Sequence, residues 1–343
     1  MRKVWLLTLA CLIQTKLVEA ALPSGYERAC GELLAELAKP YCDEMWFTPT
    51  GSLVCHKKGT GKKLMFAAHM DIIGLIVTNI SDKGYLSFTN IGGHNPAALI
   101  HTTVRFENGI RGVIKLKNQG DWAEKPASAI TLPDLYIDIA ATSREEAESM
   151  VAVGDLAMFD SKPALVGDNC LMGPYCDDLC SCIVLLMAME QLGETTSDLY
   201  FVFTVQEEVG LKGAITSTAC IEPHFGIAID VCPTGDDPSA GMDIPVAVGK
   251  GPTVKIKDMS VICSPKMVTF MQVTAEENGI PYQNEIILGG GTDTAGIMHT
   301  GKGAQAGCMS IPCRNIHSPC ELVSIRDMEN GAKLIAACAM ATL

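Results

Sequence analysis

The 343-residue sequence has no excess of basic side chains: 26 Lys and Arg face 39 Asp and Glu, for a net charge of −13. Nucleic-acid partners require basic patches against their phosphates, so this charge argues against one. Beyond the N-terminus, no apolar stretch approaches the roughly 20 residues of a membrane-spanning helix. The sequence therefore predicts neither a nucleic-acid nor a membrane partner.

The C-x-x-C spacing is also missing, although the chain has 15 cysteines. They are scattered singly, as at Cys30, Cys42 and Cys55, which a compact disulfide framework would not show. We therefore expect reduced thiols that act as small core residues in the cytoplasm. The run "CDDLCSC" (residues 176–182) lacks the spacing of a cysteine metal site.

The N-terminus leaves two interpretations open. "MRKVWLLTLACLI" combines a basic start with an apolar run, and "VEA" (residues 18–20) resembles a signal-peptide cleavage site. Gln14 and Lys16 interrupt the run, however, and an amphipathic helix can continue through Leu17 and Val18. We favour the helix over the signal peptide.

Helical and strand-like segments alternate along the first and last parts of the chain. Apolar strand patterns occur at residues 62–69, 198–205, 225–230 and 304–312, and helical patterns at 26–37, 179–192, 265–279 and 327–341. Such alternation predicts an α/β fold, with a mostly parallel sheet and helices on both faces. With this length, roughly two domains are expected.

The middle of the chain instead has short strand-like runs, with the strong hairpin signal Asn108-Gly109 between two of them. One helix is expected, opened by a capping box from Ser143 to Glu146. We therefore predict that residues 1–73 and 167–343 form the catalytic domain. Residues 74–166 would form a small inserted β-rich domain.

Acidic and imidazole side chains stand where the predicted strands end or helices begin. They are His69 with Asp71, Asp177 with Asp178, Glu207 with Glu208, then Asp230 and His317. Ligands of open α/β sheets bind beyond the carboxyl ends of the strands, so these residues are expected at one edge of one sheet.

Two hydrolytic metal ions need a bridging carboxylate, with a histidine and a carboxylate on each ion. His69, Asp177, Glu208, Asp230 and His317 supply such a set. Glu207 is left over, and as general base it would take a proton from the bridging water and pass it to the leaving amine. Asp71 suits the orientation of an imidazole. Taken singly, the Asp pair is explained as a helix cap and the Glu pair as a solvated turn, but their joint placement favours the metals.

The order of motifs is specific: "AAHMDIIG", "CDDLCSC", "TVQEEVGLKGA", "IAIDV", "GGGTDTAG" and "SIPCRNIHSP". It resembles the tetrahedral metallo-aminopeptidases, a family with glutamyl and deblocking members, some of them once labelled endoglucanases. The resemblance extends from "LPSGYE" (residues 22–27) to the last helix.

This resemblance implies His69 and Glu208 on one metal, Asp230 and His317 on the other, and Asp177 as the bridge. It implies Glu207 as general base and Asp71 as support for His69. It also places Gly290, Gly291 and Thr292 beside the substrate. The inserted domain would make dimer contacts, and the dimers would assemble into a dodecamer.

The expected function is that of an aminopeptidase that removes N-terminal residues from short peptides with two divalent ions, zinc, cobalt or manganese. The family usually has Glu where Ile72 stands and Arg where Leu179 stands, which puts specificity or activity in question. The alternatives are another two-metal hydrolase, a carboxypeptidase or deacylase, and a weakened homologue that acts as a scaffold. A glycosidase has no need of paired histidines.

Overall fold

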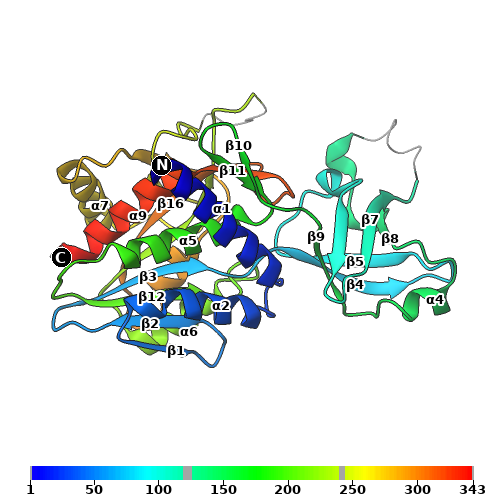
Figure 1. The fold of residues 1–343 in the computed structure, drawn as a ribbon, viewed down its shortest axis with the longest axis horizontal. Helices are drawn as coiled ribbons and strands as arrows, with labels where there is room; N and C mark the ends of the chain where they lie inside the picture. The colour runs from blue at the N-terminus through cyan, green and yellow to red at the C-terminus, as the bar shows by residue number, and fades with distance from the viewer. Residues whose placement is uncertain (1, 119–125, 239–243, 342–343) are drawn as a thin grey trace.

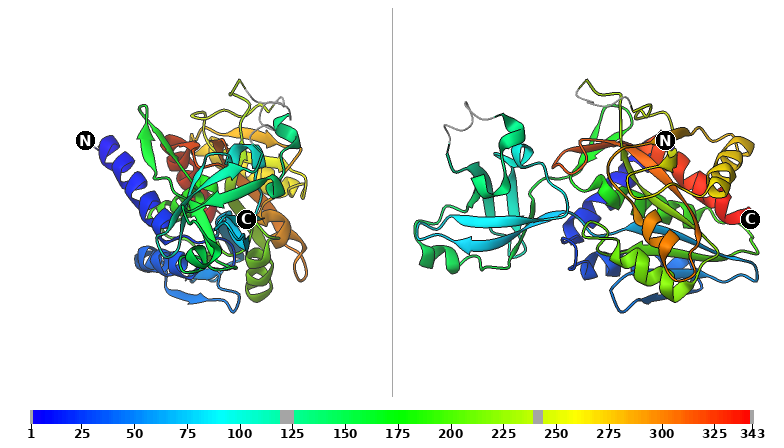
Figure 2. Two further views of the ribbon diagram at one scale, coloured as in Figure 1. Left: turned by 90° about the vertical axis from the view of Figure 1, so that its right-hand side faces the viewer. Right: turned by 180° about the vertical axis from the view of Figure 1, so that it is seen from behind.

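The computed structural model describes residues 2–118, 126–238 and 244–341. Within them the chain forms a large mixed α/β domain and a small β-barrel to one side of it (Figures 1 and 2). The predicted domain ranges also include residues 1, 119–125, 239–243 and 342–343, which lie outside the described part.

The large domain is built on an 11-stranded sheet, and its main path runs in the order β1-β2-β12-β3-β13-β16-β17-β11-β10. β14 pairs with β15 and with β16, beside this path. The strands are β1 (Glu44–Phe47), β2 (Leu53–Lys57), β3 (Lys63–His69), β10 (Ala164–Val166), β11 (Cys170–Gly173), β12 (Asp198–Thr204), β13 (Phe225–Pro233), β14 (Thr253–Lys257), β15 (Gln283–Ile286), β16 (Gln305–Arg314) and β17 (Glu321–Ser324).

Parallel pairing is confined to the centre of this sheet and to one side pair. β12, β3, β13 and β16 are parallel neighbours, and so are β14 and β15. The remaining pairs are antiparallel. The sheet is thus mixed, and the prediction of a mostly parallel sheet is wrong outside its centre. The outer strands are three to five residues long, too short for a periodic signal in the sequence.

Helices pack against the two faces of the central strands. On β3, Leu64, Phe66 and Ala68 belong to one buried cluster, which includes residues of α5 and α9. The alternating Met65 and Ala67 belong to a second cluster, which includes residues of α6 and α8. The helices of this domain are α1 (Arg2–Ala20), α2 (Arg28–Ala38), α5 (Cys176–Glu190), α6 (Lys212–Ile221), α7 (Pro265–Glu277), α8 (Asp293–His299) and α9 (Ile325–Met340).

The N-terminal helix α1 packs on this domain. Leu17 and Val18 are buried in the larger core cluster, and the Gln14 side chain donates to the Tyr175 carbonyl at 3.0 Å. None of the helices in the described part of the chain combines the length and the apolar character needed to cross a membrane.

The inserted segment closes into a barrel in the order β4-β5-β8-β7-β6-β9. Gly109, with a φ of +88°, lies in the tight connection between β6 and β7, where the sequence predicts a hairpin. The elements are β4 (Gly74–Ile80), β5 (Leu86–Ile91), β6 (Thr103–Phe106), β7 (Arg111–Leu116), β8 (Leu135–Asp138), α4 (Arg144–Glu148) and β9 (Leu156–Phe159). The strand β10 lies inside the range predicted for the insert but pairs with β11 in the large sheet, so the last barrel strand ends at Phe159.

Tyr175 joins the barrel to the large domain. The Phe159 amide donates to the Tyr175 hydroxyl at 2.6 Å, and the two rings stack with centroids 5.6 Å apart. Both residues are buried. This contact fixes the last strand of the barrel against the start of α5.

Replacing Tyr175 with Phe would keep the ring but remove the hydroxyl acceptor of the Phe159 amide. A buried donor that loses its partner destabilises a protein by roughly 1–3 kcal/mol, so Tyr175→Phe should lower the free energy of unfolding by about that amount. Denaturant unfolding measures it. Tyr26→Phe, at a side chain that is 51% exposed, is the matched control and should change little. Equal stabilities of the two variants would contradict this role.

Candidate active site

The carboxyl ends of the parallel strands meet at one pocket of about 680 Å³. His69 ends β3, Glu207 and Glu208 follow β12, Asp230 lies in β13 and His317 follows β16. Together with Asp177, at the start of α5, all of these residues line the pocket. Asp71 is fully buried next to it. The structure therefore brings together every acidic and imidazole residue that the sequence analysis selected.

Asp177 lies between the two imidazoles. Its Oδ1 is 3.1 Å from His69 Nε2, and its Oδ2 is 3.2 Å from His317 Nε2. Burial alone would raise the pKa of Asp177, but the hydrogen bonds from His317 and His69 hold it below its usual range. One carboxylate thus serves both histidines, as a bridging ligand would.

Among the described residues, two groups of side chains have ligand atoms close enough to hold a metal ion. One consists of His69, Asp177 and Glu208, and the other of His69, Asp178 and Asp230. Asp178 was selected with Asp177 in the sequence analysis but was given no place in the ligand set; helix capping was the alternative interpretation of the pair. Its Oδ2 accepts from the His69 amide at 3.2 Å, while its Oδ1 has no hydrogen-bond partner among the described residues.

Glu208 lies close to both histidines, whereas Asp230 groups with one. Glu208 shares a group with His69, as the resemblance implied, and its Oε1 also lies 3.0 Å from His317 Nε2. Asp230 shares a group with His69. The set of residues is unchanged.

Glu207 and Glu208 belong to a tight turn after β12, and their side chains have different surroundings. Gln206 has a φ of +54°, and its amide donates to Glu27 Oε1 at 3.1 Å. The next two amides, of Glu207 and Glu208, donate to the two oxygens of Asp71 at 3.0 and 3.2 Å. Within this turn Glu208 reaches His317, while Glu207 lines the pocket and belongs to neither ligand group.

The sequence suggested that Asp71 orients an imidazole, and the structure gives it further contacts. His69 Nδ1 lies 3.1 Å from the Asp71 carbonyl and 3.5 Å from its Oδ1. The Ser24 hydroxyl donates to Oδ2 at 2.6 Å. Asp71 thus positions His69 and the turn of the two glutamates together.

Glu321 on β17 was missed by the sequence analysis. Its two oxygens accept from the Asp177 and His317 amides, both at 2.8 Å. It is buried and fixes the backbone of two ligand residues. It stands two residues after the motif "SIPCRNIHSP", but a single Glu at the start of a short strand gives no signal of its own.

Two of the three residues selected from the glycine-rich loop line the pocket, and the third does not. Gly290 and Gly291 line the pocket, as the resemblance implied. Thr292 is not among the lining residues; its hydroxyl accepts from the Thr294 amide and caps α8. Ile72 and Leu179, which depart from the family pattern, are both fully buried in the apolar core and do not line the pocket.

Two glycines of the barrel press against the candidate ligands. A Cβ atom on Gly93 would lie 2.9 Å from His317 Nδ1, and one on Gly92 would lie 2.9 Å from Glu208 Oε2. Real Cβ atoms essentially never approach other atoms this closely, so a side chain at either position would displace a ligand. The segment after β5 therefore forms one wall of the cluster.

The buried charges of the pocket need a cation. Burial raises the pKa of Glu207 and of Asp178 well above the usual range, and that of Asp230 to about 8. Burial would lower the pKa of His317, but hydrogen bonds to Asp177 and Glu208 raise it to about 11. Acids with pKa values raised in this way cannot all be ionised together without further positive charge, and Asp178 Oδ1 has no partner among the described residues. The donor set therefore fits divalent metal ions.

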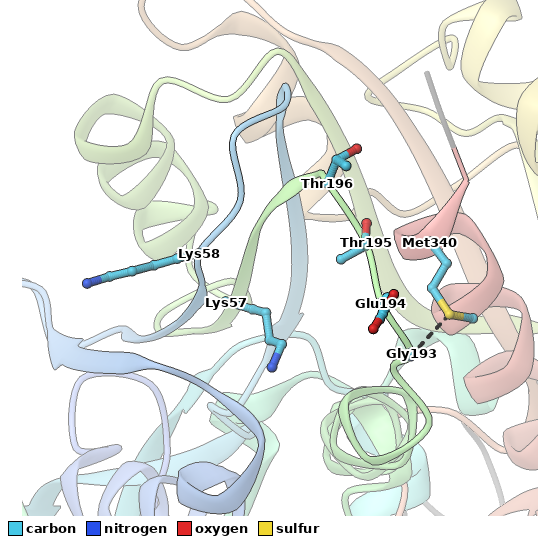
Figure 3. A pocket seen from close by; sticks show the side chains of 7 residues that line it. All are labelled: Lys57, Lys58, Gly193, Glu194, Thr195, Thr196 and Met340. Atoms are coloured by element: carbon cyan, nitrogen blue, oxygen red, sulfur yellow. Dashed lines mark hydrogen bonds between the residues drawn. The ribbon is translucent and has the colours of Figure 1, made fainter.

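Another pocket, of about 660 Å³, lies away from this cluster (Figure 3). Its charged lining is limited to Lys57, Lys58 and Glu194. In the described part of the chain, neither group of candidate metal ligands falls there. The Gly193 amide donates to Met340 Sδ across it at 3.2 Å.

A buried His and carboxylate cluster at the ends of parallel strands defines a metal-dependent hydrolase. The chain belongs to the M42 glutamyl aminopeptidase family, whose model matches residues 51–334. It is therefore an aminopeptidase, and peptidases of this family depend on divalent metal ions.

Individual relatives agree with this assignment. An aminopeptidase from the archaeon Desulfurococcus kamchatkensis has 39% identity and a TM-score of 0.93, over 98% of this chain and 96% of that one. A lysyl aminopeptidase of Pyrococcus furiosus is 34% identical over 95% of both chains. The Pyrococcus horikoshii TET1 peptidase, which can assemble into a tetrahedron or a large octahedral shell, has 31% identity and a TM-score of 0.86, over 97% of this chain and 100% of that one.

Replacing Gly93 with Ala should weaken metal binding, because the new methyl group would push His317 from its place. Changes next to a ligand typically reduce metal affinity roughly 10–100-fold, and we expect a loss of that order in a zinc titration. Gly193→Ala is the matched control, since its methyl group would meet only the flexible end of Met340 at 3.2 Å. Unchanged affinity of the folded Gly93→Ala variant would show that the barrel does not position this ligand.

Proposed function

We propose that this protein removes N-terminal residues from short peptides by means of two divalent metal ions in this pocket. The observation that carries the proposal is Asp177, which lies within 3.2 Å of both His69 and His317. A carboxylate shared by two imidazoles is the arrangement that a pair of adjacent ions requires.

The proposed ligands are His69 and Asp230 for one ion, His317 and Glu208 for the other, and Asp177 between them. Asp178, which shares a group with His69 and Asp230, is an additional candidate. The ions, zinc, cobalt or manganese, would polarise the scissile carbonyl and lower the pKa of the attacking water.

The protein's own groups would then move the proton. Glu207 faces the pocket outside both ligand groups, so its carboxylate is free to take a proton from water and to deliver it to the leaving amine. Asp71 would act as a positioning residue, because it holds His69 and both glutamate amides. Gly290 and Gly291 would border the bound peptide.

The alternatives receive less support. A carboxypeptidase needs a cation for the C-terminal carboxylate of its substrate, but Lys255, the only Lys or Arg in the described lining, is paired with Asp258 and Glu285. A weakened scaffold protein was suggested by Ile72 and Leu179, yet both side chains lie in the core rather than in the pocket.

We also propose a division of labour between domains and a larger assembly. Residues 1–73 and 167–343 would carry catalysis, and the insert at residues 74–166, apart from β10, would make dimer contacts. The dimers would assemble into a dodecamer, and the shell described for the P. horikoshii TET1 peptidase supports this. The cysteines, which are all free, suit a reducing cytoplasm.

A peptide with a free N-terminus should be trimmed from that end, and its acetylated copy should be cut at least roughly tenfold more slowly, because a blocked amine no longer fits an aminopeptidase. A chelator should abolish the reaction, and Zn²⁺, Co²⁺ or Mn²⁺ should restore it. Mass spectrometry of the products identifies the trimmed end. Release of C-terminal residues, or full activity without metal, would refute the proposal.

Glutamine substitutions should separate the two glutamates. Glu207→Gln removes the base but no proposed ligand, so activity should fall roughly 10²–10⁴-fold with metal content unchanged. Glu208→Gln replaces a charged ligand with an amide and should lower metal content at limiting metal, with partial rescue by excess. Metal analysis and initial rates measure both effects, each variant serving as control for the other. Loss of metal from the Glu207 variant alone would reverse the roles.

A further inference from the structure

The pocket has a charged side and an apolar side. The proposed ligands and Glu207 form the first. The second consists of apolar lining residues outside that cluster, namely Leu211, Val231, Pro233, Met259, Ile287 and Ile316. A peptide whose scissile bond lies at the charged side must place its first side chain elsewhere in the pocket, and the apolar side is the remaining wall.

Met259 and Ile287 approach from two segments that pair with each other. β14 and β15 are parallel neighbours, and the Ile287 amide donates to the Lys257 carbonyl at 3.1 Å. Asp258 then turns the chain, because its Oδ1 accepts from the Ser260 and Val261 amides at 2.7 and 2.8 Å. The turn presents Met259 at the pocket, where its side chain is 75% exposed.

The exposed part of this apolar wall is Met259 itself. A large apolar side chain left open in a pocket is typical of a binding surface, and its place beside the charged cluster identifies the bound peptide as the occupant. The chain neighbours Ile286 and Leu288, 49% and 69% exposed, do not line the pocket.

Outside the proposed ligands and Glu207, the described lining offers no available charge for a charged first residue. Lys255 is fully buried, with its Nζ 3.1 Å from Glu285 Oε1 and 3.4 Å from Asp258 Oδ2. Glu285 and Asp258 are themselves fully or almost fully buried, and they accept from Thr253 and Ser260 as well. This internal group neither attracts an acidic side chain nor presents an anion to a basic one.

We propose that the pocket selects peptides whose first residue carries a large apolar side chain, such as Leu, Met or Phe, with Met259 and Ile287 as specificity-determining residues. This inference rests on the aminopeptidase function proposed above. It differs from the specificities in the names of the family and of the P. furiosus relative, which are glutamyl and lysyl.

The first test measures kcat/KM for the metal-loaded enzyme on a set of tripeptides Xaa-Ala-Ala. We expect Leu, Met and Phe to exceed Glu, Lys and Ala roughly tenfold or more, because an apolar pocket gains from burying the side chain and a charged one stays unpaired. If every peptide is trimmed but Glu or Lys is the preferred first residue, the inference is overturned and the proposed function stands. Absence of N-terminal trimming with every peptide would overturn the proposed function, and the inference with it.

The second test changes the charge of the pocket. Met259→Lys should raise the ratio of kcat/KM for Glu over Leu substrates roughly tenfold or more, since it places a cation where none is available. Ile262→Lys is the matched control: it lies on the same loop, is 68% exposed and does not line the pocket. Met259→Leu should keep the original preference. The ratio is independent of the fraction of active enzyme, and an equal shift in both Lys variants would contradict a role for Met259.

Discussion

The active site depends on the parallel pairing of β12, β3, β13 and β16, which brings four strand ends to one edge of the sheet. Carboxylates and imidazoles carried by these ends, and by the start of α5, are forced into a small buried volume. Their mutual repulsion is unfavourable unless cations are present. The same excess of negative charge that strains the folded chain is what gives such a site its affinity for metal ions.

A second layer of buried acids keeps these ligands in place. Asp71 accepts from two consecutive amides after β12, Glu27 from the amide before them, and Glu321 from the amides of Asp177 and His317. Each of these carboxylates is fixed by backbone donors, so the ligand-bearing loops cannot drift without leaving a buried acid unpaired. Precise placement of a few side chains on loops thus follows from acids that never face the substrate.

The sequence predicted the proposed ligand set because it follows a simple rule: polar residues directly after apolar strands converge when those strands are parallel neighbours. The contacts of Asp178, Glu321 and the glycines at positions 92 and 93 could not be predicted this way. They depend on the approach of segments that are distant in the chain, such as Glu321 and Asp177, which are 144 positions apart. The same limit applies to the sheet. Its long central strands have an apolar pattern that could be recognised in the sequence, whereas β10, with three residues, is too short to show one.

The proposed chemistry and the proposed selectivity lie on different parts of the scaffold. The proposed ligands come mainly from the parallel centre of the sheet, where strand register fixes each position. Met259 and Ile287 instead follow β14 and β15, which pair beside the main path of the sheet. Loops outside a rigid core tolerate substitution far better than the core does. A change at Met259, which is 75% exposed, would therefore alter the wall that meets the substrate without moving a ligand, because its side chain does not bond to the charged cluster. Members of one family can in this way keep a common metal centre and still differ in the residue they remove.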